Sequence, residues 1–580
     1  MDKLVRINMT TRKVEVEKLP DKYKGKGGRW LSSMMVNDEV PADCHPLGPN
    51  SKLVFAPGIL SSTRAPNSGR ISVGGKSPLT GGIKEANAGT PFSQSLARMG
   101  IAALVVEGLS EDNKSWMVKV GVDGGEVVPA DDLAGMGAYE SGHKLWEKFG
   151  EKTPFVVNGP AGEAKMVMAG LAFNDPEGRA ARYAGRGGLG AVMGSKGLKA
   201  ICLDDSDAKG VEPADAELLK TGQKKLADAI LEHDVTKKGG ALNSFGTAVL
   251  INILNEAGGL PTNNFRTGVF EGAQKISGES LAEAAKTRGG AGMMGHRCHP
   301  GCIISCSTVY PHQDGSEHVS SVEYESIWSL GANCGIDNLD HVAELVWQCN
   351  DLGLDTIEAG VTIGVAMEAG LLEFGDGEGA IKLMDEIRNR TPLGHILGQG
   401  AQFTGEAYGV TRIPCVKRQG MPAYEPRAVK GIGVTYATST MGADHTAGYT
   451  VAPEIMSVGG KADPLSKKDK IGLSKAFQDT TAFLDAAGYC IFIAFPILDI
   501  ESGFEGVIET VNGMLGTDYK AEDVTRIGDE ILRIERDFNF RAGIGKEQDR
   551  MPEFMKYEKL PPHNNVWDIS DEELDTFWEQ

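Results

Sequence analysis

Positive charge is in short supply in this chain. Its 59 lysine and arginine residues face 79 aspartate and glutamate residues, which leaves a formal net charge of −20 at pH 7. A surface of that sign repels phosphate backbones and anionic lipids. We therefore expect neither nucleic acid nor a membrane surface as a partner.

Long apolar runs are also lacking. The longest, around Tyr489 to Ile500, is interrupted by Pro496 and is too short to span a bilayer. The first residues show no basic segment followed by an apolar one, so no secretory signal is predicted. We expect no insertion into a membrane.

Cysteine is too sparse for a disulfide-stabilised fold. Nine cysteines in 580 residues, three of them crowded together, do not form the pattern of a disulfide framework. Free thiols require a reducing compartment, so a cytoplasmic location is expected. The hydrophobic fraction of 41% and the charged fraction of 24% are typical of a globular protein. A chain of 580 residues is too long for one core, which predicts two to four domains.

The residue pattern changes near residue 208. Short runs such as LVRINMT, KVEVEKL, KLVFAPG and SWMVKVGV, separated by turn residues, predict a β-rich part over 1–208. Beyond the charged stretch DDSDAKGVEPADAE, apolar residues recur every three or four positions and predict helices. An irregular stretch at 408–427 divides the helical part into 209–415 and 416–580. The predicted fold class is α+β, with a β-rich N-terminal domain followed by two mainly helical domains.

Four cysteines carry the strongest chemical signal. Cys298, Cys302 and Cys306 crowd into GHRCHPGCIISCS, and Cys490 stands far downstream in LDAAGYC. Three close thiolates completed by a distant fourth are typical of an iron–sulfur cluster held between two parts of a fold. A cluster implies electron transfer, so a second redox centre is expected elsewhere in the chain.

Other metal chemistries compete for this cysteine motif. His296 and His299 flank Cys298, so a zinc site is an alternative, although no second ligand pair follows. A radical enzyme that uses S-adenosylmethionine has a shorter spacing and would leave Cys490 without a role. Four further cysteines are interpreted as core residues of no chemical function: Cys44, Cys202, Cys349 and Cys415.

Two segments far apart in the chain share one layout. Asn350 to Asp355 reads NDLGLD, and Asp485 to Cys490 reads DAAGYC. In each, a glycine after a helical pattern predicts a helix that ends in the left-handed conformation. Two such ends could hold two similar polar ligands in matching ways, although unrelated helix stops would look the same.

Arginines beside glycines form another candidate site. Arg70 stands in NSGR, and Arg182 and Arg186 stand in RYAGRGGLG. A guanidinium next to exposed backbone N–H groups suits phosphate. GRGGLG also matches a dinucleotide fingerprint weakly, since no clear strand precedes it. Turn-rich β structure is the alternative interpretation.

With these motifs the chain resembles the aldehyde:ferredoxin oxidoreductase family. The resemblance covers essentially the whole length and rests on GRISVGGKSPLTGGIKEANAG, AGRGGLGAVMGSKGLKAI, SFGTAVLINILNEAGGLPTNNF, VEYESIWSLGANCGIDNLD, CNDLGLDTIEAG, PAYEPRAVKGIGVTYATSTMGADHTAG and LDAAGYC. It implies a tungsten, or molybdenum, bis-pyranopterin cofactor in which the pterins supply the metal's sulfur ligands. It also implies a [4Fe-4S] cluster and a Mg²⁺ ion between the pterin phosphates.

The resemblance implies a role for each matching residue. The residues expected to grip the pterin phosphates are Arg70, Asn87, Gly89 and Arg186; the Asn87 side chain and the Gly187 carbonyl would lie near Mg²⁺. One pterin would be held by Asn350, Leu354 and Asp355, and the other by Asp485 and Tyr489. The cluster would be bound by Cys298, Cys302, Cys306 and Cys490, with Cys490 also touching a pterin.

Glu325 in EYES and His445 in GADHTAG match the family's acid–base pair beside the metal. Taken alone, each has an ordinary interpretation, as a glutamate near a helix start and a buried histidine. A general acid–base pair needs two titratable groups in a dry pocket with tuned pKa values. We expect Glu325 to activate the attacking water and His445 to hydrogen-bond the carbonyl oxygen.

Three departures from the family pattern indicate a divergent branch. HPG widens the spacing between Cys298 and Cys302, Tyr489 replaces a more usual leucine, and Asn350 stands where an aspartate is common. Cys334 raises a further question, because a cysteine ligates tungsten in a relative that reduces aromatic-ring thioesters. We assign Cys334 to the core.

The function expected from the resemblance is interconversion of an aldehyde and a carboxylic acid. Electrons would leave through the cluster to ferredoxin or a ferredoxin-like subunit, and a homodimer or a larger complex is expected. One alternative keeps the cofactor and changes the substrate, as the active-site subunit of a CoA-thioester reductase. Another is a non-catalytic metal-binding scaffold. The physiological substrate does not follow from the sequence.

Overall fold

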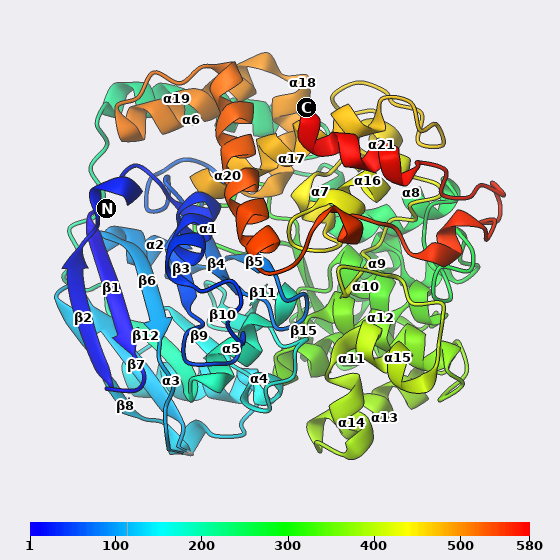
Figure 1. The fold of residues 1–580 in the computed structure, drawn as a ribbon, viewed down its shortest axis with the longest axis horizontal. Coiled ribbons are helices and arrows are strands. Elements are labelled where there is room, and N and C mark those ends of the chain that lie inside the picture. The colour runs from blue at the N-terminus through cyan, green and yellow to red at the C-terminus, as the bar shows by residue number, and fades with distance from the viewer. Residues whose placement is uncertain (113) are drawn as a thin grey trace.

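The computed structural model describes residues 1–112 and 114–580. Its first part contains two six-stranded sheets (Figure 1). The first sheet runs β2-β1-β6-β3-β4-β5 and the second β11-β10-β9-β12-β7-β8. The strands are β1 Lys3–Asn8, β2 Lys13–Lys18, β3 Leu53–Pro57, β4 Arg70–Lys76, β5 Ile83–Gly89, β6 Ile101–Glu107, β7 Trp116–Gly121, β8 Gly124–Pro129, β9 Phe155–Asn158, β10 Leu171–Asn174, β11 Ala180–Ala184 and β12 Leu198–Leu203. The predicted hairpin of LVRINMT and KVEVEKL is confirmed as the antiparallel pair β1–β2.

The two sheets share one hydrophobic core. Valine, isoleucine, leucine and phenylalanine side chains from both sheets form a continuous buried cluster. At its centre Phe55 of β3 and Phe173 of β10 pack with Phe92 of helix α2 (Pro91–Arg98), with ring centroids 5.4–6.4 Å apart. Edge-to-face packing of such rings holds the sheets in a fixed relation. The outer faces are covered by α1 (Gly28–Glu39) on the first sheet and α3 (Ala138–Phe149) on the second.

The remainder is mainly helical, as predicted. The longer helices are α6 Ala216–Glu232, α9 Gly278–Arg288, α11 Leu339–Leu352, α12 Thr356–Glu368, α13 Gly377–Arg388, α15 Gly400–Tyr408, α16 Lys430–Thr438, α17 Lys470–Ala487, α19 Glu501–Leu515 and α20 Ala521–Arg541. The shorter ones are α7 Ala241–Phe245, α8 Leu250–Glu256, α10 Tyr324–Leu330, α14 Pro392–Leu397, α18 Ala494–Asp499 and α21 Asp571–Asp575, while the short helices α4 Pro160–Glu163 and α5 Leu189–Ser195 belong to the first part. None of the helices in the described ranges is both long and apolar enough to cross a membrane.

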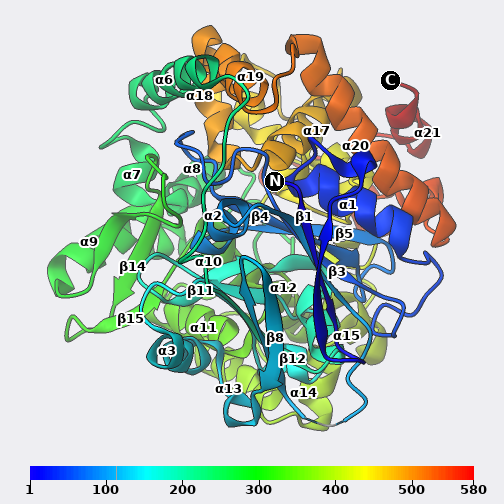
Figure 2. The ribbon, with the colours of Figure 1, turned by 90° about the vertical axis from the view of Figure 1, so that its left-hand side faces the viewer.

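Packing crosses the expected boundary between the two helical parts. Helices α6 and α19 lie side by side in both ribbon views (Figure 2). Glycines allow the close approach, because a Cβ on Gly222 would lie 2.7 Å from the Gly506 carbonyl oxygen. Buried residues of segments 209–415 and 416–580 belong to one continuous hydrophobic cluster.

A small sheet holds the cysteine motif. Strands β13 (Met293–His296), β14 (Ser307–Pro311) and β15 (Glu317–Ser320) form a three-stranded antiparallel sheet. The loop with three cysteines connects β13 to β14. The sheet therefore fixes both ends of that loop.

The two echoed helix ends dock in matching ways. Helix α11 ends at Gly353 and α17 at Gly488, with φ of +79° and +87°. Gly353 accepts a hydrogen bond from Gly170 N (2.9 Å) just before β10, and Gly488 accepts one from Arg70 N (3.2 Å) at the start of β4. The predicted left-handed ends are thus confirmed. They attach corresponding loops to corresponding hairpins of the two sheets.

Both attachments depend on glycine contacts. A Cβ on Gly159 would lie 2.3 Å from the Leu352 carbonyl oxygen, and one on Gly58 would lie 2.2 Å from Gly488 Cα. Such distances exclude any side chain at these positions without backbone movement. The two helix ends can therefore reach the sheets only where both partners lack a Cβ.

Candidate active site

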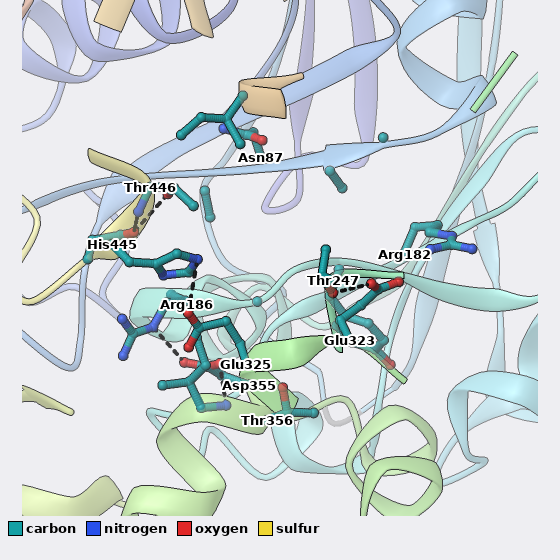
Figure 3. Close-up of a pocket in the computed structure, with 18 of the residues that line it drawn as sticks. Asn87, Arg182, Arg186, Thr247, Glu323, Glu325, Asp355, Thr356, His445 and Thr446 are labelled. Carbon is teal, nitrogen blue, oxygen red and sulfur yellow. Dashed lines mark hydrogen bonds and ion pairs between the residues drawn. The ribbon is translucent and has the colours of Figure 1, made fainter. Parts of the chain in front are cut away.

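One buried cavity of about 370 Å³ lies between the sheets and the helices (Figure 3). Most residues singled out from the sequence line it: Arg70, Asn87, Gly89, Arg186, Cys298, Cys306, Glu325, Asn350, Leu354, Asp355, His445, Asp485 and Cys490. Gly187, Cys302 and Tyr489 do not line it. The structure thus brings together segments that are hundreds of residues apart in the chain.

Glu325 and His445 meet in this cavity. Glu325 lies in the first turn of α10, and His445 opens a short 3₁₀ turn, His445–Ala447. The His445 Nε2 and Glu325 Oε1 atoms are 3.3 Å apart, and the side chains keep exposed fractions of 16% and 15%. Glu325 Oε2 accepts a hydrogen bond from Ala423 N at 3.1 Å. Among the described residues, the buried Glu325 Oε1 and His445 Nδ1 atoms have no hydrogen-bond partner.

Burial moves the two pKa values in opposite directions. It raises the pKa of Glu325 to about 8, because the charged carboxylate is desolvated. It lowers the pKa of His445 to about 4, for the same reason applied to a cation. Burial therefore favours a protonated carboxyl and a neutral imidazole over a carboxylate–imidazolium ion pair.

The turn that carries His445 is fixed by a buried ion pair. Asp444 Oδ1 accepts hydrogen bonds from Thr446 N (3.0 Å) and Thr446 Oγ1 (2.8 Å), which caps the turn. Asp444 Oδ2 accepts one from Lys84 Nζ of β5 at 3.1 Å. Although burial opposes ionisation, the charges of Lys84 and Arg186 hold the pKa of Asp444 below its ordinary value. Sequence reasoning missed this pair, although Asp444 adjoins His445 in GADHTAG.

Arg186 connects three parts of the fold. Its guanidinium donates to Asp355 Oδ2 (3.1 Å), the Ala443 carbonyl oxygen (2.6 Å) and the Gly420 carbonyl oxygen (2.6 Å). Asp355 caps α12 by accepting from Ile357 N at 3.0 Å. The guanidinium expected to face phosphate is thus hydrogen-bonded to the protein at the wall of the cavity.

Acidic and amide side chains gather at another wall. Asp485 Oδ1 accepts from Asn87 Nδ2 at 3.4 Å, and its Oδ2 from Arg29 Nη1 at 3.3 Å. Arg70 donates to the Asn87 carbonyl oxygen at 3.1 Å and also to its side chain. Burial, with the charge of nearby Glu85, raises the pKa of Asp485 to about 8. Glu85 Oε1 is buried and has no hydrogen-bond partner among residues 1–112 and 114–580, so a ligand at this wall could supply the missing donor.

The two loops expected to hold pterins differ in the side chains that they direct into the cavity. Asn350 lines the cavity and donates to Tyr139 Oη at 3.0 Å. The Tyr489 side chain points away, and its hydroxyl pairs with Thr510 Oγ1 of α19 at 2.7 Å. Gly187 also faces elsewhere, since its carbonyl oxygen accepts from Ser77 Oγ at 2.7 Å. At Tyr489 only the backbone remains for a contact with a cofactor.

The four cysteines expected to bind a cluster lie in one region of the fold. The Cys298, His299 and Cys302 ligand atoms lie within 4.8 Å of one another, and Asn67 donates to Cys302 Sγ at 3.4 Å. The Asn67 carbonyl oxygen accepts from Cys490 N at 2.9 Å, which brings the fourth cysteine to the same loop. Burial, with the charges of Glu323, Cys298 and Cys490, raises the pKa of Cys306 above its ordinary value.

The flanking histidines have separate partners. His296 Nδ1 lies 3.0 Å from Arg182 Nη2, and its Nε2 lies 2.7 Å from Glu177 Oε2. Both ring nitrogens of His296 therefore contact the charged side chains of Arg182 and Glu177 and not the thiols. His299 Nδ1 lies 3.1 Å from Cys298 Sγ. The donor set of four thiols matches the composition of a [4Fe-4S] site.

Cys334 lies outside the cavity. Its side chain is fully buried, and its Sγ donates to the Ser329 carbonyl oxygen at 3.2 Å. Burial raises its pKa above the ordinary range of a thiol. The structure thus places Cys334 in the core, away from Glu325 and His445.

A polar network at the cluster end was not found from the sequence. Glu323 Oε1 accepts from Ser307 Oγ (2.8 Å) and Oε2 from Thr247 Oγ1 (2.7 Å), as Figure 3 shows in part. Arg182 donates to the same Ser307 hydroxyl at 2.9 Å. Arg182 stood within the RYAGRGGLG motif, but nothing in its neighbours pointed to the cysteine loop.

Comparisons with known proteins agree over the whole chain. Residues 4–205 match the family model of the aldehyde ferredoxin oxidoreductase N-terminal domain, and residues 221–580 match that of domains 2 and 3. The chain is 36% identical to a tungsten-containing aldehyde ferredoxin oxidoreductase of Thermococcus kodakarensis and 35% identical to that of Pyrococcus furiosus; each alignment covers 97% of this chain and 92% of the relative.

A solved structure shares the fold. The active site complex BamBC of benzoyl coenzyme A reductase, with 1,5-dienoyl-CoA, superposes with a TM-score of 0.80 over 100% of this chain and 93% of that chain, at 17% identity. At that identity the likeness concerns the fold alone. The family models and the two archaeal relatives decide the assignment: the chain belongs to the aldehyde ferredoxin oxidoreductase family of oxidoreductases.

Proposed function

We propose that this protein is a tungsten-dependent oxidoreductase that interconverts an aldehyde and a carboxylic acid. One observation carries the proposal: the Glu325–His445 pair and three of the four convergent thiols line the same cavity. Aldehyde and water would give the acid, two protons and two electrons. The cavity thus combines groups that move protons with a route for electrons.

The cavity walls fit a bis-pyranopterin cofactor of tungsten or molybdenum. Asn350, Leu354 and Asp355 would hold one pterin, and Arg70, Asn87 and Asp485 the other. The unpartnered Glu85 oxygen supports this fit, because pterin ring N–H groups supply the missing donors. When bound, this cofactor would accept the two electrons released when the carbonyl carbon of the aldehyde is oxidised.

The chain's own residues would handle the protons. The protonated Glu325 carboxyl would donate to the carbonyl oxygen as negative charge develops there, and neutral His445 would accept a proton from the attacking water. These roles are the reverse of those expected from the sequence, because burial leaves the proton on the carboxyl. The ion pair of Asp444 with Lys84 would keep the imidazole in place.

Electrons would leave through the cysteine site. Cys298, Cys302, Cys306 and Cys490 would bind a [4Fe-4S] cluster, and Cys490 follows directly on the helix end that carries Asp485. The acceptor would be ferredoxin or a ferredoxin-like subunit. All nine cysteines are free, which suits a reducing cytoplasm.

A metal ion and a protein partner complete the proposal. A Mg²⁺ ion would lie near Asn87 and Gly187, although the Gly187 carbonyl oxygen already accepts a hydrogen bond from Ser77 Oγ. A homodimer or a larger complex is also proposed. The relatives are called ferredoxin oxidoreductases and the structural neighbour is part of a complex, which supports a protein partner.

The position of Cys334 favours the aldehyde reaction over thioester reduction. A thioester reductase of the kind considered above would need a cysteine near the acid–base pair. In the part of the chain that the structure describes, the cavity is lined by only three cysteines, all of them from the cluster set. Cys334 Sγ instead lies within hydrogen-bonding distance of the Ser329 carbonyl oxygen of α10 and the Gly360 carbonyl oxygen of α12.

A substrate comparison tests the proposal. Anaerobically purified, tungsten-loaded protein would be assayed for reduction of a viologen dye with aldehydes, and for oxidation of reduced dye with acyl-CoA thioesters. Dye reduction with aldehydes and formation of the acid are expected. Turnover of thioesters without any aldehyde oxidation would refute the proposal, as would protein that binds neither tungsten nor molybdenum.

A further inference from the structure

The His299 side chain is buried beside the first cysteine of the motif. Its Nδ1 atom lies 3.1 Å from Cys298 Sγ, and the residue is 0% exposed. Its Nε2 atom has no hydrogen-bond partner within residues 1–112 and 114–580, so in those ranges the thiol is the ring's one polar partner. A metal-bound thiolate carries no proton, so Nδ1 would be the donor in this contact.

A tight turn places the imidazole there. Cys302 N donates to the His299 carbonyl oxygen at 3.3 Å, and Gly301 between them has a φ of +89°. Proline at the second position of a turn and glycine in the left-handed region at the third are typical of a type II turn. Pro300 and Gly301 are exposed, whereas His299 is buried. The HPG sequence that widens the cysteine spacing therefore also buries the ring.

Two glycines at the end of the β4–β5 hairpin make room for this ring. A Cβ on Gly69 would lie 2.3 Å from His299 Cδ2. A Cβ on Gly89 would lie 2.9 Å from His299 Nδ1 and 3.0 Å from Cys298 Sγ. Contacts this short leave no space for a side chain at either glycine while the ring stays in place. The fold thus holds the imidazole in a closely fitting site against the thiol.

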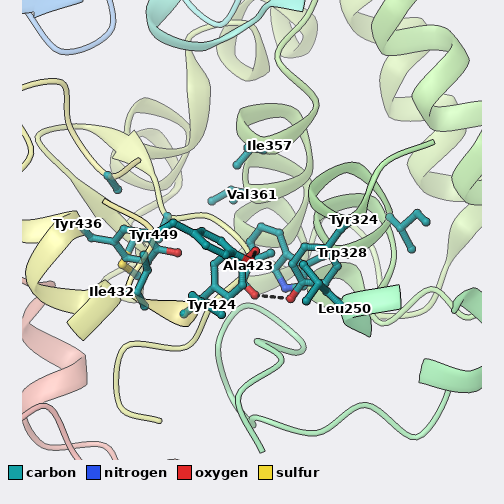
Figure 4. Close-up of a cluster of buried hydrophobic side chains, with 14 of the residues drawn as sticks. Leu250, Tyr324, Trp328, Ile357, Val361, Ala423, Tyr424, Ile432, Tyr436 and Tyr449 are labelled. Carbon is teal, nitrogen blue, oxygen red and sulfur yellow. Dashed lines mark hydrogen bonds between the residues drawn. The ribbon is translucent and has the colours of Figure 1, made fainter. Parts of the chain in front are cut away.

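The surroundings of Cys298 suit a thiolate. Cys302 Sγ likewise lies 3.4 Å from the Asn67 side-chain amide nitrogen and 3.4 Å from a backbone N–H. Cys334 shows the opposite pattern, because its Sγ lies 3.2 Å and 3.4 Å from backbone carbonyl oxygens of α10 and α12, whose side chains meet in the hydrophobic cluster of Figure 4. N–H groups stabilise negative charge on sulfur and carbonyl oxygens oppose it. Cys298 and Cys302 therefore face donors, whereas the core thiol faces acceptors.

We propose that His299 raises the reduction potential of the [4Fe-4S] cluster through its N–H···S hydrogen bond to Cys298. This inference rests on the proposed function, which supplies the cluster and, from the oxidised aldehyde, the electrons. One electron enters the cluster at a time, no covalent bond forms or breaks, and the proton stays on Nδ1. The cysteine sulfurs share the added negative charge, so the hydrogen bond is stronger in the reduced state and favours it. His299 acts through Cys298 and is a positioning residue for the electron outlet.

Two variants of matched shape separate the hydrogen bond from the space that the ring fills. His299→Leu removes the donor, whereas His299→Asn keeps an amide N–H close to the position of Nδ1. The measurement is a dithionite titration of anaerobically purified protein, followed by the electron paramagnetic resonance (EPR) signal of the reduced cluster. We expect the equilibrium constant for cluster reduction to fall about tenfold in His299→Leu, which lowers the potential by about 59 mV for one electron. In His299→Asn it should stay within about twofold of the unaltered value.

Pulsed EPR of the unaltered protein decides the matter even if His299→Leu does not assemble a cluster. Histidine labelled with a nitrogen isotope would be incorporated, and the reduced cluster examined for coupling to that nitrogen. A weak coupling, as from a ring nitrogen that hydrogen-bonds to a cluster sulfur, is expected, and it should vanish in His299→Asn. A strong coupling would make His299 an iron ligand, and no coupling would remove the hydrogen bond; either result overturns the inference.

The outcomes distinguish this inference from the proposed function. An unchanged or higher potential in His299→Leu, at an iron content equal to that of the unaltered protein, would overturn the role of His299 while the cluster stands. An equal fall in His299→Leu and His299→Asn would also overturn it, because the ring would then act by its shape. Unaltered protein without the signal of a reduced [4Fe-4S] cluster would overturn the proposed cluster, and the role of His299 with it.

Discussion

His445 Nε2 lies 3.3 Å from Glu325 Oε1, across 120 positions of sequence, in a cavity also lined by Cys298, Cys306 and Cys490. In the part of the chain that the structure describes, neither Glu325 Oε1 nor His445 Nδ1 has a hydrogen-bond partner. Buried polar atoms are ordinarily paired, so two unpaired atoms on neighbouring side chains mark this pair as a candidate site of chemistry. The predictions below follow from this pair and from the way the fold holds it.

Removing the proton from Glu325 should abolish most catalysis. Glu325→Gln keeps the shape and the contact to Ala423 N but cannot donate a carboxyl proton. We expect kcat to fall about 10²- to 10⁴-fold, the usual contribution of general acid–base catalysis. The measurement is viologen reduction by an aldehyde, with tungsten and iron contents matched to the unaltered enzyme. Full turnover in the loaded variant would contradict the assignment.

The pH profile should show two limits. His445 must be neutral and Glu325 protonated, so kcat/KM should rise as the pH passes about 4 and fall as it passes about 8. The residual activity of Glu325→Gln should lose the alkaline limit only, since glutamine does not titrate. An alkaline limit that stays at the same pH in this variant would assign it to another group.

Each cluster cysteine should be required for a complete iron site. Cys490→Ser should lower the iron content per chain and change the cluster's electron paramagnetic resonance (EPR) signal, because the fourth thiolate is lost. Cys334→Ser is the matched control, since a hydroxyl can still donate to the Ser329 carbonyl outside the cavity. Zinc in place of iron in anaerobically purified protein, or an unchanged cluster in Cys490→Ser, would refute the assignment.

The docked helix ends should tolerate no side chain. Gly488→Ala combines a strained φ of +87° with a Cβ 2.8 Å from Gly58 Cα. We expect a loss of about 2–5 kcal/mol, the sum of left-handed strain and overpacking. Gly409→Ala is the control, because Gly409 ends α15 at φ +70° with nothing within 4 Å; it should cost about 1–2 kcal/mol. Denaturant unfolding gives both values, and equal losses would show that the contact with Gly58 is unimportant.

Features fixed by local chemistry could be predicted from the sequence. Gly353 and Gly488 were predicted to end helices because left-handed backbone favours glycine, and both do. The β-rich start and the helical remainder followed from periodicities of two and of three to four residues. The motifs that carry the family resemblance contain most of the residues expected at the site that line the cavity. No spacing in the sequence indicated that these segments would lie together in the fold.

Features that depend on tertiary packing could not be predicted. The Lys84–Asp444 pair joins β5 to the His445 turn over 360 positions, and no sequence pattern relates the two. Tyr489 was expected at a pterin because of its place in the echo, but its ring turns to Thr510. The division of roles between Glu325 and His445 depends on burial, which sets the direction of each pKa shift.

The central claim is that one cavity joins aldehyde chemistry at Glu325 and His445 to an electron outlet at the four cysteines. The most direct test is EPR spectroscopy of the oxidised, tungsten-loaded protein after anaerobic addition of benzaldehyde. The spectrum of a reduced [4Fe-4S] cluster should appear together with benzoate, and it should be weak or absent in Glu325→Gln. A cluster that dithionite reduces but benzaldehyde and other aldehydes do not would contradict the account.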